Sequence, residues 1–415
     1  MTVLQRQGQA AKAAGYTLAT AGTARKNAAL EAIADMLAKR QDEWLAANAE
    51  DVAAARAAGM RPSMLDRLAL TPQRVADIVD GVRQVIALPD PIGKVDRMET
   101  RPNGLIIGRR RVPLGVVAII FEARPNVTVD AAALCLKSGN VCILRGGREA
   151  IRSNRKAVEL MREALASAGL PEDCVSLVQD TSHETANELM HLDGYVDVLI
   201  PRGGAGLIRA VAKEASVPVI RTGEGVCHIY VDSEADLDMG AKILYNAKCS
   251  RPSVCNAVEC LLVQEDVAAA FLKKAVPLLD GHKVELRCDA KALALLGDRA
   301  VSAAESDWDA EYDDYILAIR IVKDLEEAIG FINRHGTGHS EAIITTNYFK
   351  AQRFLDAVDA AAVYVNASTR FTDGREFGLG AEIGISTQKM HARGPMGLEE
   401  LTSCKYVVYG EGQVR

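Results

Sequence analysis

The alternation of buried strands with helices constrains the fold of this chain more than any other feature of its sequence. Residues 114–121 form a continuous apolar run, as expected of a strand buried on both faces in a parallel sheet. A helical pattern follows, and the cycle then repeats. The predicted strands are 141–144, 175–178, 196–200 and 217–220, and the predicted helices are 129–137, 152–168, 183–192 and 205–215. Strands that alternate with helices in this way indicate βαβ units and a doubly wound parallel sheet.

A second alternation, over residues 229–366, predicts a second α/β domain. At 415 residues the chain is too long for one compact core, which agrees with this division. Before the first sheet, residues 24–58 have the apolar spacing of one or two long amphipathic helices. Residues 104–112 and 405–409 are predicted to be extended and have no obvious place in either sheet. We expect them to form an arm used in assembly, with a plain surface strand as the alternative for the first segment.

Composition argues against several classes of partner. The net charge of −6 gives no reason to expect nucleic acid or an anionic membrane. No apolar run approaches the roughly 18 residues that span a bilayer, and residues 1–8 lack the apolar core of a signal peptide. The nine cysteines are odd in number and irregular in spacing, so they indicate a reducing cytoplasm rather than a disulfide framework. His335 and His339 are separated by glycines that predict a loop, so we expect no bound metal.

Cys255 is the strongest candidate for a nucleophile. Residues 237–246 predict a helix and residues 258–263 predict a strand, so Cys255 lies in the polar connection between them. A thiol in such a connection can meet a ligand, whereas a core thiol would sit inside an apolar run. Lys248 and Arg251 supply positive charge in this segment, and positive charge stabilises a thiolate. The alternative is that all the cysteines of this segment are small structural residues.

Polar or glycine-rich turns follow three strands of the first predicted sheet, at the edge where ligands of open parallel sheets bind. They contain Arg124 and Asn126 after the first strand, Arg145, Gly146 and Gly147 after the second, and Gly203 and Gly204 after the fourth. Glycine lets backbone amides approach a phosphate, and the N-terminus of the helix that follows favours negative charge. Neither glycine turn has the Gly-x-Gly-x-x-Gly or P-loop spacing. Each therefore indicates either a phosphate site or an ordinary strand–helix turn.

Taken in order, these elements resemble the aldehyde dehydrogenase superfamily, and they are most similar to the branch that reduces L-glutamyl 5-phosphate. The segments that carry the resemblance are 59–68, 112–126, 136–147, 197–204, 251–257 and 377–387. The resemblance implies an α/β fold with a cofactor domain at 1–97 and 114–227, a catalytic domain at 228–395, and an oligomerisation arm at 98–113 and 396–415. It implies a homo-oligomer, a dimer or tetramer, that uses NADPH to make L-glutamate 5-semialdehyde. The same resemblance places the chain in proline biosynthesis, in functional connection with a glutamate 5-kinase.

The resemblance also implies roles for individual residues. Cys255 would attack the acyl phosphate and expel phosphate, Asn126 and the backbone amide of Cys255 would form the oxyanion hole, and the resulting thioester would be reduced. The positions that match the cofactor site are Arg145, Gly146, Gly147, Gly203, Gly204 and Glu311. Glu311 would bind a ribose and Arg145 the 2′-phosphate of NADPH, with a surface ion pair as the alternative for Arg145. The candidate cations for the substrate are Arg124, Arg251, Arg370 and Arg375, each of which is otherwise expected in a structural ion pair.

One departure from the superfamily concerns the general base. Hydrolytic members carry a glutamate that activates water, and the position aligned with it here is Thr222, with Glu224 two residues further on. Loss of that base suits an acyl-enzyme that exchanges with phosphate rather than with water. The sequence leaves two alternative functions open: a hydrolytic or CoA-acylating aldehyde dehydrogenase, and a catalytically inactive binding protein built on the same fold.

Overall fold

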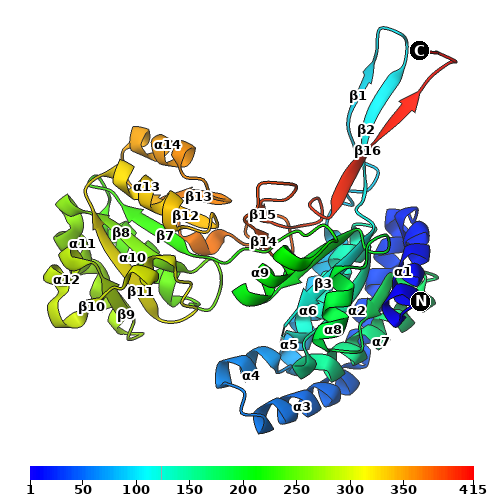
Figure 1. Ribbon diagram of the computed structural model, residues 1–415, viewed down its shortest axis with the longest axis horizontal. Helices are drawn as coiled ribbons and strands as arrows, with labels where there is room; N and C mark the ends of the chain where they lie inside the picture. The colour runs from blue at the N-terminus through cyan, green and yellow to red at the C-terminus, as the bar shows by residue number, and fades with distance from the viewer. Residues whose placement is uncertain (123) are drawn as a thin grey trace. The chain divides into compact units, whose positions relative to one another are not determined.

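The structure is a computed structural model that describes residues 1–122 and 124–415. Its contacts divide the chain into two compact units, and each is described by itself (Figure 1). Unit 1 comprises Met1–Thr222, Gly378–Gly384 and Met396–Arg415, and unit 2 comprises Gly223–Phe377 and Ile385–Pro395. Residues 223–227, which the resemblance assigns to the cofactor domain, belong by their contacts to unit 2. The division of function between domains stays a prediction.

A parallel sheet of strand order β5-β4-β3-β6 forms the centre of unit 1. The strands are β3 Val116–Phe121, β4 Val141–Arg145, β5 Val175–Leu177 and β6 Val198–Arg202, and the helices that connect or follow them are α6 Pro125–Lys137, α7 Ile151–Ser167, α8 His183–Met190 and α9 Ala205–Glu214. Every residue of β3 is buried, as its apolar run predicts. The doubly wound parallel sheet is confirmed. The predicted strand 217–220 is wrong, because it contributes an isolated bridge between Leu199 and Val219 and contains Pro218, which has no N–H to donate.

A group of helices precedes this sheet in unit 1. They are α1 Val3–Ala19, α2 Thr23–Lys39, α3 Gln41–Ala57, α4 Pro62–Leu68 and α5 Pro72–Ala87. The predicted helical stretch 24–58 becomes α2 and α3, whereas the sequence patterns considered above do not include α1 or α5. α1 begins with a capping box, in which Thr2 and Gln5 satisfy each other's backbone N–H groups. α3 is fixed to α7 through buried Trp44, whose Nε1 donates to the carbonyl of Ser153 at 3.0 Å.

The predicted arm is an antiparallel sheet of order β1-β2-β16 that projects from unit 1 (Figure 1). It consists of β1 Val95–Thr100, β2 Ile106–Pro113 and β16 Thr402–Tyr409. The segments predicted to be extended therefore pair with each other, although residues 114–401 separate them in the sequence. Met98 and Tyr406 leave 50% and 66% of their surface exposed. Exposed strands of this kind tend to pair with another chain, so the role of the arm in assembly stays a prediction.

Unit 2 is built on a sheet of strand order β10-β9-β11-β8-β7-β12-β13 in which every pairing is parallel. Its strands are β7 Cys227–Val231, β8 Val258–Gln264, β9 Glu285–Cys288, β10 Val301–Ser302, β11 Ile316–Val322, β12 Ser340–Ile344 and β13 Ala362–Val365. Its helices are α10 Leu237–Cys249, α11 Glu265–Asp280, α12 Ala290–Leu296, α13 Leu325–His335 and α14 Tyr348–Ala357, and a small antiparallel pair is made by β14 Ile385–Ser386 and β15 Gly394–Pro395. The predicted second α/β domain is confirmed.

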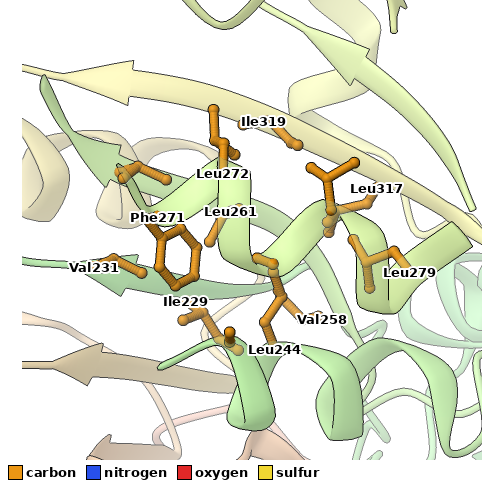
Figure 2. Packing of buried hydrophobic residues seen from close by; sticks show 14 of the residues in the cluster. Ile229, Val231, Leu244, Val258, Leu261, Phe271, Leu272, Leu279, Leu317 and Ile319 are labelled. Carbon is orange, nitrogen blue, oxygen red and sulfur yellow. The ribbon is translucent and has the colours of Figure 1, made fainter. Parts of the chain in front are cut away.

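The core of unit 2 holds β8 firmly between its neighbours. Phe271 of α11 lies over Ile229 of β7 and Leu261 of β8, and all three side chains are fully buried (Figure 2). Leu244 of α10 is buried in the same cluster, beside Val258 at the start of β8. Packing at this density fixes side chains in single positions. The segment between α10 and β8 therefore connects two elements that are both anchored in the core.

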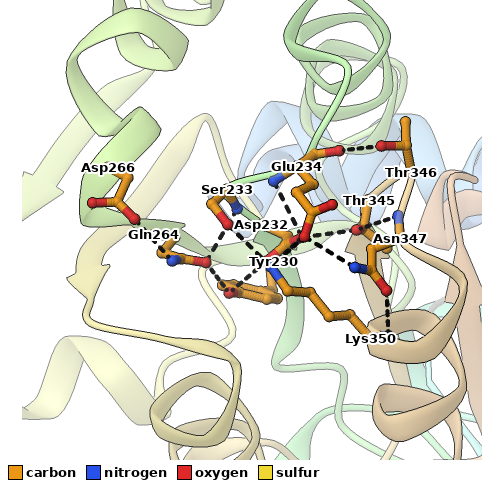
Figure 3. Close-up of polar contacts among 10 residues, drawn as sticks. All are labelled: Tyr230, Asp232, Ser233, Glu234, Gln264, Asp266, Thr345, Thr346, Asn347 and Lys350. Carbon is orange, nitrogen blue, oxygen red and sulfur yellow. Dashed lines mark hydrogen bonds and ion pairs between the residues drawn. The ribbon is translucent and has the colours of Figure 1, made fainter.

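The carboxyl ends of β7 and β12 are closed by a network of polar contacts (Figure 3). Asp232 is buried there and accepts hydrogen bonds from Lys350 Nζ at 2.9 Å and Thr345 Oγ1 at 2.8 Å. Burial raises the pKa of Asp232, but the hydrogen bonds from Lys350 and Thr345 outweigh it and hold that pKa below its ordinary value. Since these groups satisfy one another, we assign them to joining α14 to the sheet.

Candidate active site

Cys255 lies at the amino edge of the unit 2 sheet, between the end of α10 at Cys249 and the start of β8 at Val258. All nine cysteines are free thiols. Cys249 and Cys260 are buried, with 5% and 1% of their surface exposed, whereas Cys255 is partly exposed. The accessible thiol of the segment is therefore the one that the sequence singled out. Its role as the nucleophile stays a prediction.

The backbone around Cys255 is clamped from both sides. Gly225 lies so close that a Cβ atom there would overlap the carbonyl oxygen of Cys255. The same oxygen accepts a hydrogen bond from Cys227 Sγ at 3.2 Å. On the other side, Asn256 Nδ2 donates to the carbonyl of Thr372 at 3.0 Å, and Thr369 Oγ1 donates to the carbonyl of Asn256 at 2.7 Å. A nucleophile held in this way loses little freedom when it reacts, which favours catalysis.

A buried ion pair joins the two ends of the segment. Lys248, in the last turn of α10, and Glu259, in β8, are 0% and 1% exposed, and Lys248 Nζ lies 2.5 Å from Glu259 Oε2. Burial raises the pKa of Glu259 to about 8, although the charge of Lys248 opposes that rise. From the sequence, Lys248 is expected to be one of the positive charges available to Cys255. The structure corrects this, because the buried ammonium group of Lys248 pairs with Glu259 and so links α10 to β8.

We expect replacement of Lys248 by methionine to destabilise the protein strongly. Removing one partner of a buried pair leaves an uncompensated charge, which typically costs about 3–5 kcal/mol. The measurement is urea unfolding followed by tryptophan fluorescence. Lys274→Met is the matched control, because Lys274 pairs with Asp238 at 2.6 Å on the surface and should change the free energy of unfolding by less than about 1 kcal/mol. Adding Glu259→Leu to Lys248→Met should recover most of the loss, and a double variant no more stable than the single one would contradict this account.

Two of the four predicted substrate cations lie together beside Cys255. Arg370 Nε donates to Ser250 Oγ at 3.1 Å, and its Nη1 donates to Asn256 Oδ1. Burial lowers the pKa of Arg370, the nearby charge of Arg251 lowers it further, and the Cys255 thiolate opposes both. Arg251 itself is exposed. Unit 2 therefore places the guanidinium group of Arg370 within electrostatic reach of Cys255, with the charge of Arg251 close to Arg370.

The other two predicted cations are not brought to this place by the contacts of unit 2. The side chain of Arg375 is exposed, while its backbone N–H donates to Asp373 Oδ1 at 2.9 Å. Arg124 belongs to unit 1, where it is the exposed N-cap residue of α6.

Asn126 follows β3 in the first turn of α6 and is partly buried. Its Nδ2 donates to Asp130 Oδ2, one turn along the helix, at 2.9 Å. An amide nitrogen carries two N–H groups, so this bond fixes the orientation of the side chain and leaves it a second N–H. Asn126 lies in unit 1 and Cys255 in unit 2. The oxyanion role assigned to Asn126 stays a prediction.

Arg145 ends β4 and points its guanidinium at backbone carbonyl groups. Its Nη2 donates to Thr181 at 2.7 Å and to Ser182 at 3.1 Å, while its Nε is buried with no partner in the described chain. Burial lowers the pKa of Arg145, and the nearby carboxylates oppose that shift. No ion pair joins Arg145 to a carboxylate of the described residues, so the surface ion pair considered from the sequence is not observed. An orphaned guanidinium nitrogen suits an anionic ligand.

The two glycine turns are close-fitting. A Cβ atom on Gly146 would overlap the side chain of Asn154, and one on Gly203 would overlap Glu122. Glu122 Oε2 accepts a hydrogen bond from the backbone N–H of Gly204 at 2.9 Å, at the N-terminus of α9. A carboxylate thus caps the helix end at which the sequence predicts a phosphate. Sequence reasoning missed Glu122, although it directly follows β3 in the same turn as Asn126.

Glu311 is linked to the segment around Cys255 by Gly225, which packs against the Cys255 backbone. Its Oε1 accepts a hydrogen bond from the backbone N–H of Gly225 at 2.9 Å. Burial raises the pKa of Glu311 to about 7, the Gly225 hydrogen bond opposes the rise, and the charges of Asp313 and Glu224 add to it. Perturbed carboxyl groups of this kind are frequent in functional sites.

Thr222 is buried, and its Oγ1 donates to the carbonyl of Pro201 at 2.8 Å. The hydroxyl at the aligned general-base position is therefore already hydrogen-bonded within unit 1.

Within residues 1–122 and 124–415, no group of three or more His, Cys, Asp or Glu side chains could hold a metal ion. His228, in β7, is buried and pairs with Glu341 at 2.9 Å. In the same described ranges no helix has the length and apolar character needed to span a membrane.

The chain matches the model of the aldehyde dehydrogenase family over residues 4–292 and 315–407. Glu311 falls in the gap between these ranges. A protein of Clostridium perfringens named gamma-glutamyl phosphate reductase is 59% identical over 409 residues, covering 99% of this chain and 98% of that protein. One of Enterococcus faecalis with the same name is 55% identical over 415 residues, covering 100% and 99% of the two chains.

Solved structures agree with these relatives. The crystal structure of gamma-glutamyl phosphate reductase from Thermotoga maritima matches with a TM-score of 0.97 and 48% identity over the whole of both chains. An acetylating aldehyde dehydrogenase from Geobacillus thermoglucosidasius, at 17% identity and a TM-score of 0.72 over 99% of this chain and 97% of that one, shares the fold alone. The predicted resemblance and the aldehyde-dehydrogenase-like fold class are both confirmed. The chain therefore belongs to the aldehyde dehydrogenase family, and it is an oxidoreductase of that family.

Proposed function

We propose that this chain is a gamma-glutamyl phosphate reductase that converts L-glutamyl 5-phosphate into L-glutamate 5-semialdehyde and phosphate, in proline biosynthesis. The observation that carries the proposal is the 59% identity with a relative of that name over 409 residues. The accessible Cys255 and the two cations beside it supply a chemical reason for it. A kinase that makes the acyl phosphate is the functional partner that this reaction requires.

In the proposed reaction Cys255 is the nucleophile. Its thiolate attacks the acyl carbon of the substrate, the C–O bond to phosphate breaks, and a thioester to Cys255 forms. Arg370, whose charge interacts with Cys255, and Arg251 close to it are the proposed partners for the negative charges of the phosphate and carboxylate of the substrate. Asn126 and the backbone N–H of Cys255 are the proposed donors to the oxyanion that develops on the acyl oxygen.

The proposed cofactor is NADPH, which would supply the hydride for reduction of the thioester; the aldehyde leaves as the C–S bond breaks and the Cys255 thiolate is restored. In unit 1, Arg145 with its orphaned Nε and the close-fitting turns at Gly146, Gly147, Gly203 and Gly204 are the residues that would hold the cofactor's phosphate groups. Glu122 now accepts from Gly204, so it must give up that hydrogen bond if a phosphate takes the same N–H. In unit 2, Glu311 is the proposed acceptor for ribose hydroxyl groups.

The proposed role of Glu311 predicts a pH dependence of cofactor affinity. The ionised carboxylate accepts hydrogen bonds from a ribose better than the protonated acid, and this group loses its proton as the pH rises through about 7. The dissociation constant for NADP⁺ should therefore fall as the pH rises from 6 to 8, by about tenfold for one charged hydrogen bond. Glu311→Gln should bind more weakly at pH 8 and lose this part of the pH dependence. Exposed Glu305→Gln is the control, and a pH profile that Glu311→Gln leaves unchanged would contradict the assignment.

The proposal is tested by supplying L-glutamyl 5-phosphate, made in place by a glutamate 5-kinase, to the purified chain and following loss of NADPH. One equivalent of semialdehyde should form for each NADPH consumed, and NADH should be the poorer reductant. L-aspartyl 4-phosphate, shorter by one methylene, is the control substrate and should react more slowly. Equal rates with the two acyl phosphates, or no consumption of NADPH, would overturn the proposed substrate.

A further inference from the structure

Unit 1 contains a cavity of about 750 Å³ at the edge of its sheet away from the proposed cofactor turns. Gly115 and Gly139 line it, just before β3 and β4 begin, and Asp197 lines it just before β6. The turns at Arg145 and Gly203 lie at the carboxyl ends of the same strands. In a parallel sheet these two edges are a full strand length apart. The cavity is therefore separate from the site described above.

Three cations line this cavity without a side-chain partner among residues 1–122 and 124–415. Lys12 comes from α1, Arg110 from β2 and Lys405 from β16. Arg110 and Lys405 are direct register partners in the arm. Among the described residues, none of the three side chains makes a hydrogen bond or an ion pair. Like charges placed opposite each other destabilise a sheet, and in the described part of the chain no contact of these side chains offsets that cost.

The N-terminus of α2 adds to the positive potential. Gly22 and Thr23 line the cavity; Gly22 is the N-cap residue, and no side-chain cap and no acidic residue in the first turn neutralise this end of the helix. The unsatisfied N–H groups at such an end favour an anion.

The acidic residues of the lining are already engaged. Asp90 accepts from Lys26 Nζ at 2.6 Å and from Thr23 Oγ1 at 2.8 Å, and Asp197 accepts from the backbone N–H of Val116 at 2.7 Å. With Lys26 and Arg111 included, the lining has five cations and two carboxylates. The lining is therefore positive, although the chain as a whole carries a net charge of −6.

We propose that the cavity is a binding site for a small organic anion that carries carboxylate or phosphate groups, held by Arg110, Lys405 and Lys12. Cavities of about 300–1,000 Å³ are the usual size for small-molecule sites. Tyr16, also in the lining, offers an aromatic face to the carbon frame of such a ligand. Because the cavity joins the base of the arm to α1 and α2, a bound anion stabilises the arm against the body of unit 1.

The test is calorimetric titration of the full-length chain with citrate and, separately, with inorganic pyrophosphate, at constant ionic strength. The variants are Arg110→Gln, Lys405→Gln and the double substitution. Arg109→Gln is the matched control, because Arg109 is the neighbouring exposed arginine of β2 and does not line the cavity. At least one anion should bind the unmodified chain and raise its melting temperature. The double variant should bind it about 10–100-fold more weakly, as expected for the loss of charged hydrogen bonds, and Arg109→Gln should bind normally.

Without added anion, the double variant should melt at a higher temperature than the unmodified chain at low salt, because the repulsion between residues 110 and 405 is gone. Binding of citrate alone identifies the ligand as a carboxylate, and binding of pyrophosphate alone identifies it as a phosphate. Failure of both anions to bind, or equal binding by the double variant, would overturn the proposal. It would also be overturned if sedimentation showed that the double variant changes the oligomer mass while anion affinity stays unchanged, since the cations would then serve contact between copies.

Discussion

Replacing Cys255 with serine is expected to abolish formation of the semialdehyde while NADPH binding stays close to normal. A serine hydroxyl at neutral pH is a weak nucleophile without an adjacent general base, whereas a cysteine sulfur is intrinsically a much stronger nucleophile. The change is nearly isosteric, and the carbonyl of Cys255 keeps its contacts with Gly225 and Cys227. The loss should therefore appear in turnover and not in folding. Steady-state NADPH oxidation measures the first, and fluorescence titration with NADPH measures the second.

Two other cysteines provide controls for this experiment. Cys404→Ser changes a partly exposed thiol in the arm, and Cys249→Ser changes a buried thiol six residues before Cys255. Both variants should keep substantial activity, with some loss of stability for Cys249→Ser because a hydroxyl is then buried. Mass spectrometry of the unmodified chain, trapped with substrate in the absence of NADPH, should show acylation on the peptide that contains Cys255. A Cys249→Ser variant as inactive as Cys255→Ser would show that the nucleophile is wrongly assigned or shared.

The fold could be predicted from the sequence where one strong physical signal controlled it. The buried strand at 116–121 is apolar at every position, and both parallel sheets follow from repeated runs of that kind. The segment 217–220 has the same apolar character, yet it forms a single bridge because Pro218 interrupts it. α1 has a mixed, alanine-rich surface and buried glycine and alanine positions, so its apolar pattern is weak. Its place in the fold depends on tertiary contacts.

The candidate site could be predicted in its residue types but not in its contacts. Cys255, Arg251 and Arg370 could be named from the sequence, but that Arg370 reaches Ser250 and Asn256 across more than 100 residues depends on the folded chain. The predicted role of Lys248 as a charge available to Cys255 is wrong, because its ion-pair partner Glu259 lies in β8, a strand made mostly of apolar residues. Glu122 gave no signal, since a carboxylate at the N-terminus of α9 is recognisable only once β3 and β6 lie side by side.

The second large effect is expected in the reverse reaction, with glutamate semialdehyde and NADP⁺. Steady formation of NADPH should require inorganic phosphate or arsenate, because the thioester on Cys255 needs an acceptor other than water. Without either anion, only a burst of about one equivalent per active site should appear, which is the usual sign of an acyl-enzyme that accumulates. The structural reason is that buried Thr222 stands at the aligned general-base position and has its hydroxyl engaged by Pro201. Rapid-mixing absorbance of NADPH, with and without phosphate, measures both phases.

Glu224 is the residue that decides between this expectation and a hydrolytic enzyme. It lies two positions from Thr222, and its charge contributes to the raised pKa of Glu311. Glu224→Gln should leave the burst and its slow decay unchanged if no carboxylate activates water. If the unmodified chain instead turns over rapidly without phosphate and Glu224→Gln stops that turnover, Glu224 is the base and the enzyme is a hydrolytic aldehyde dehydrogenase. Rapid turnover that requires added CoA rather than phosphate would point to a CoA-acylating enzyme. Each acceptor thus gives a different kinetic pattern from the same thioester on Cys255.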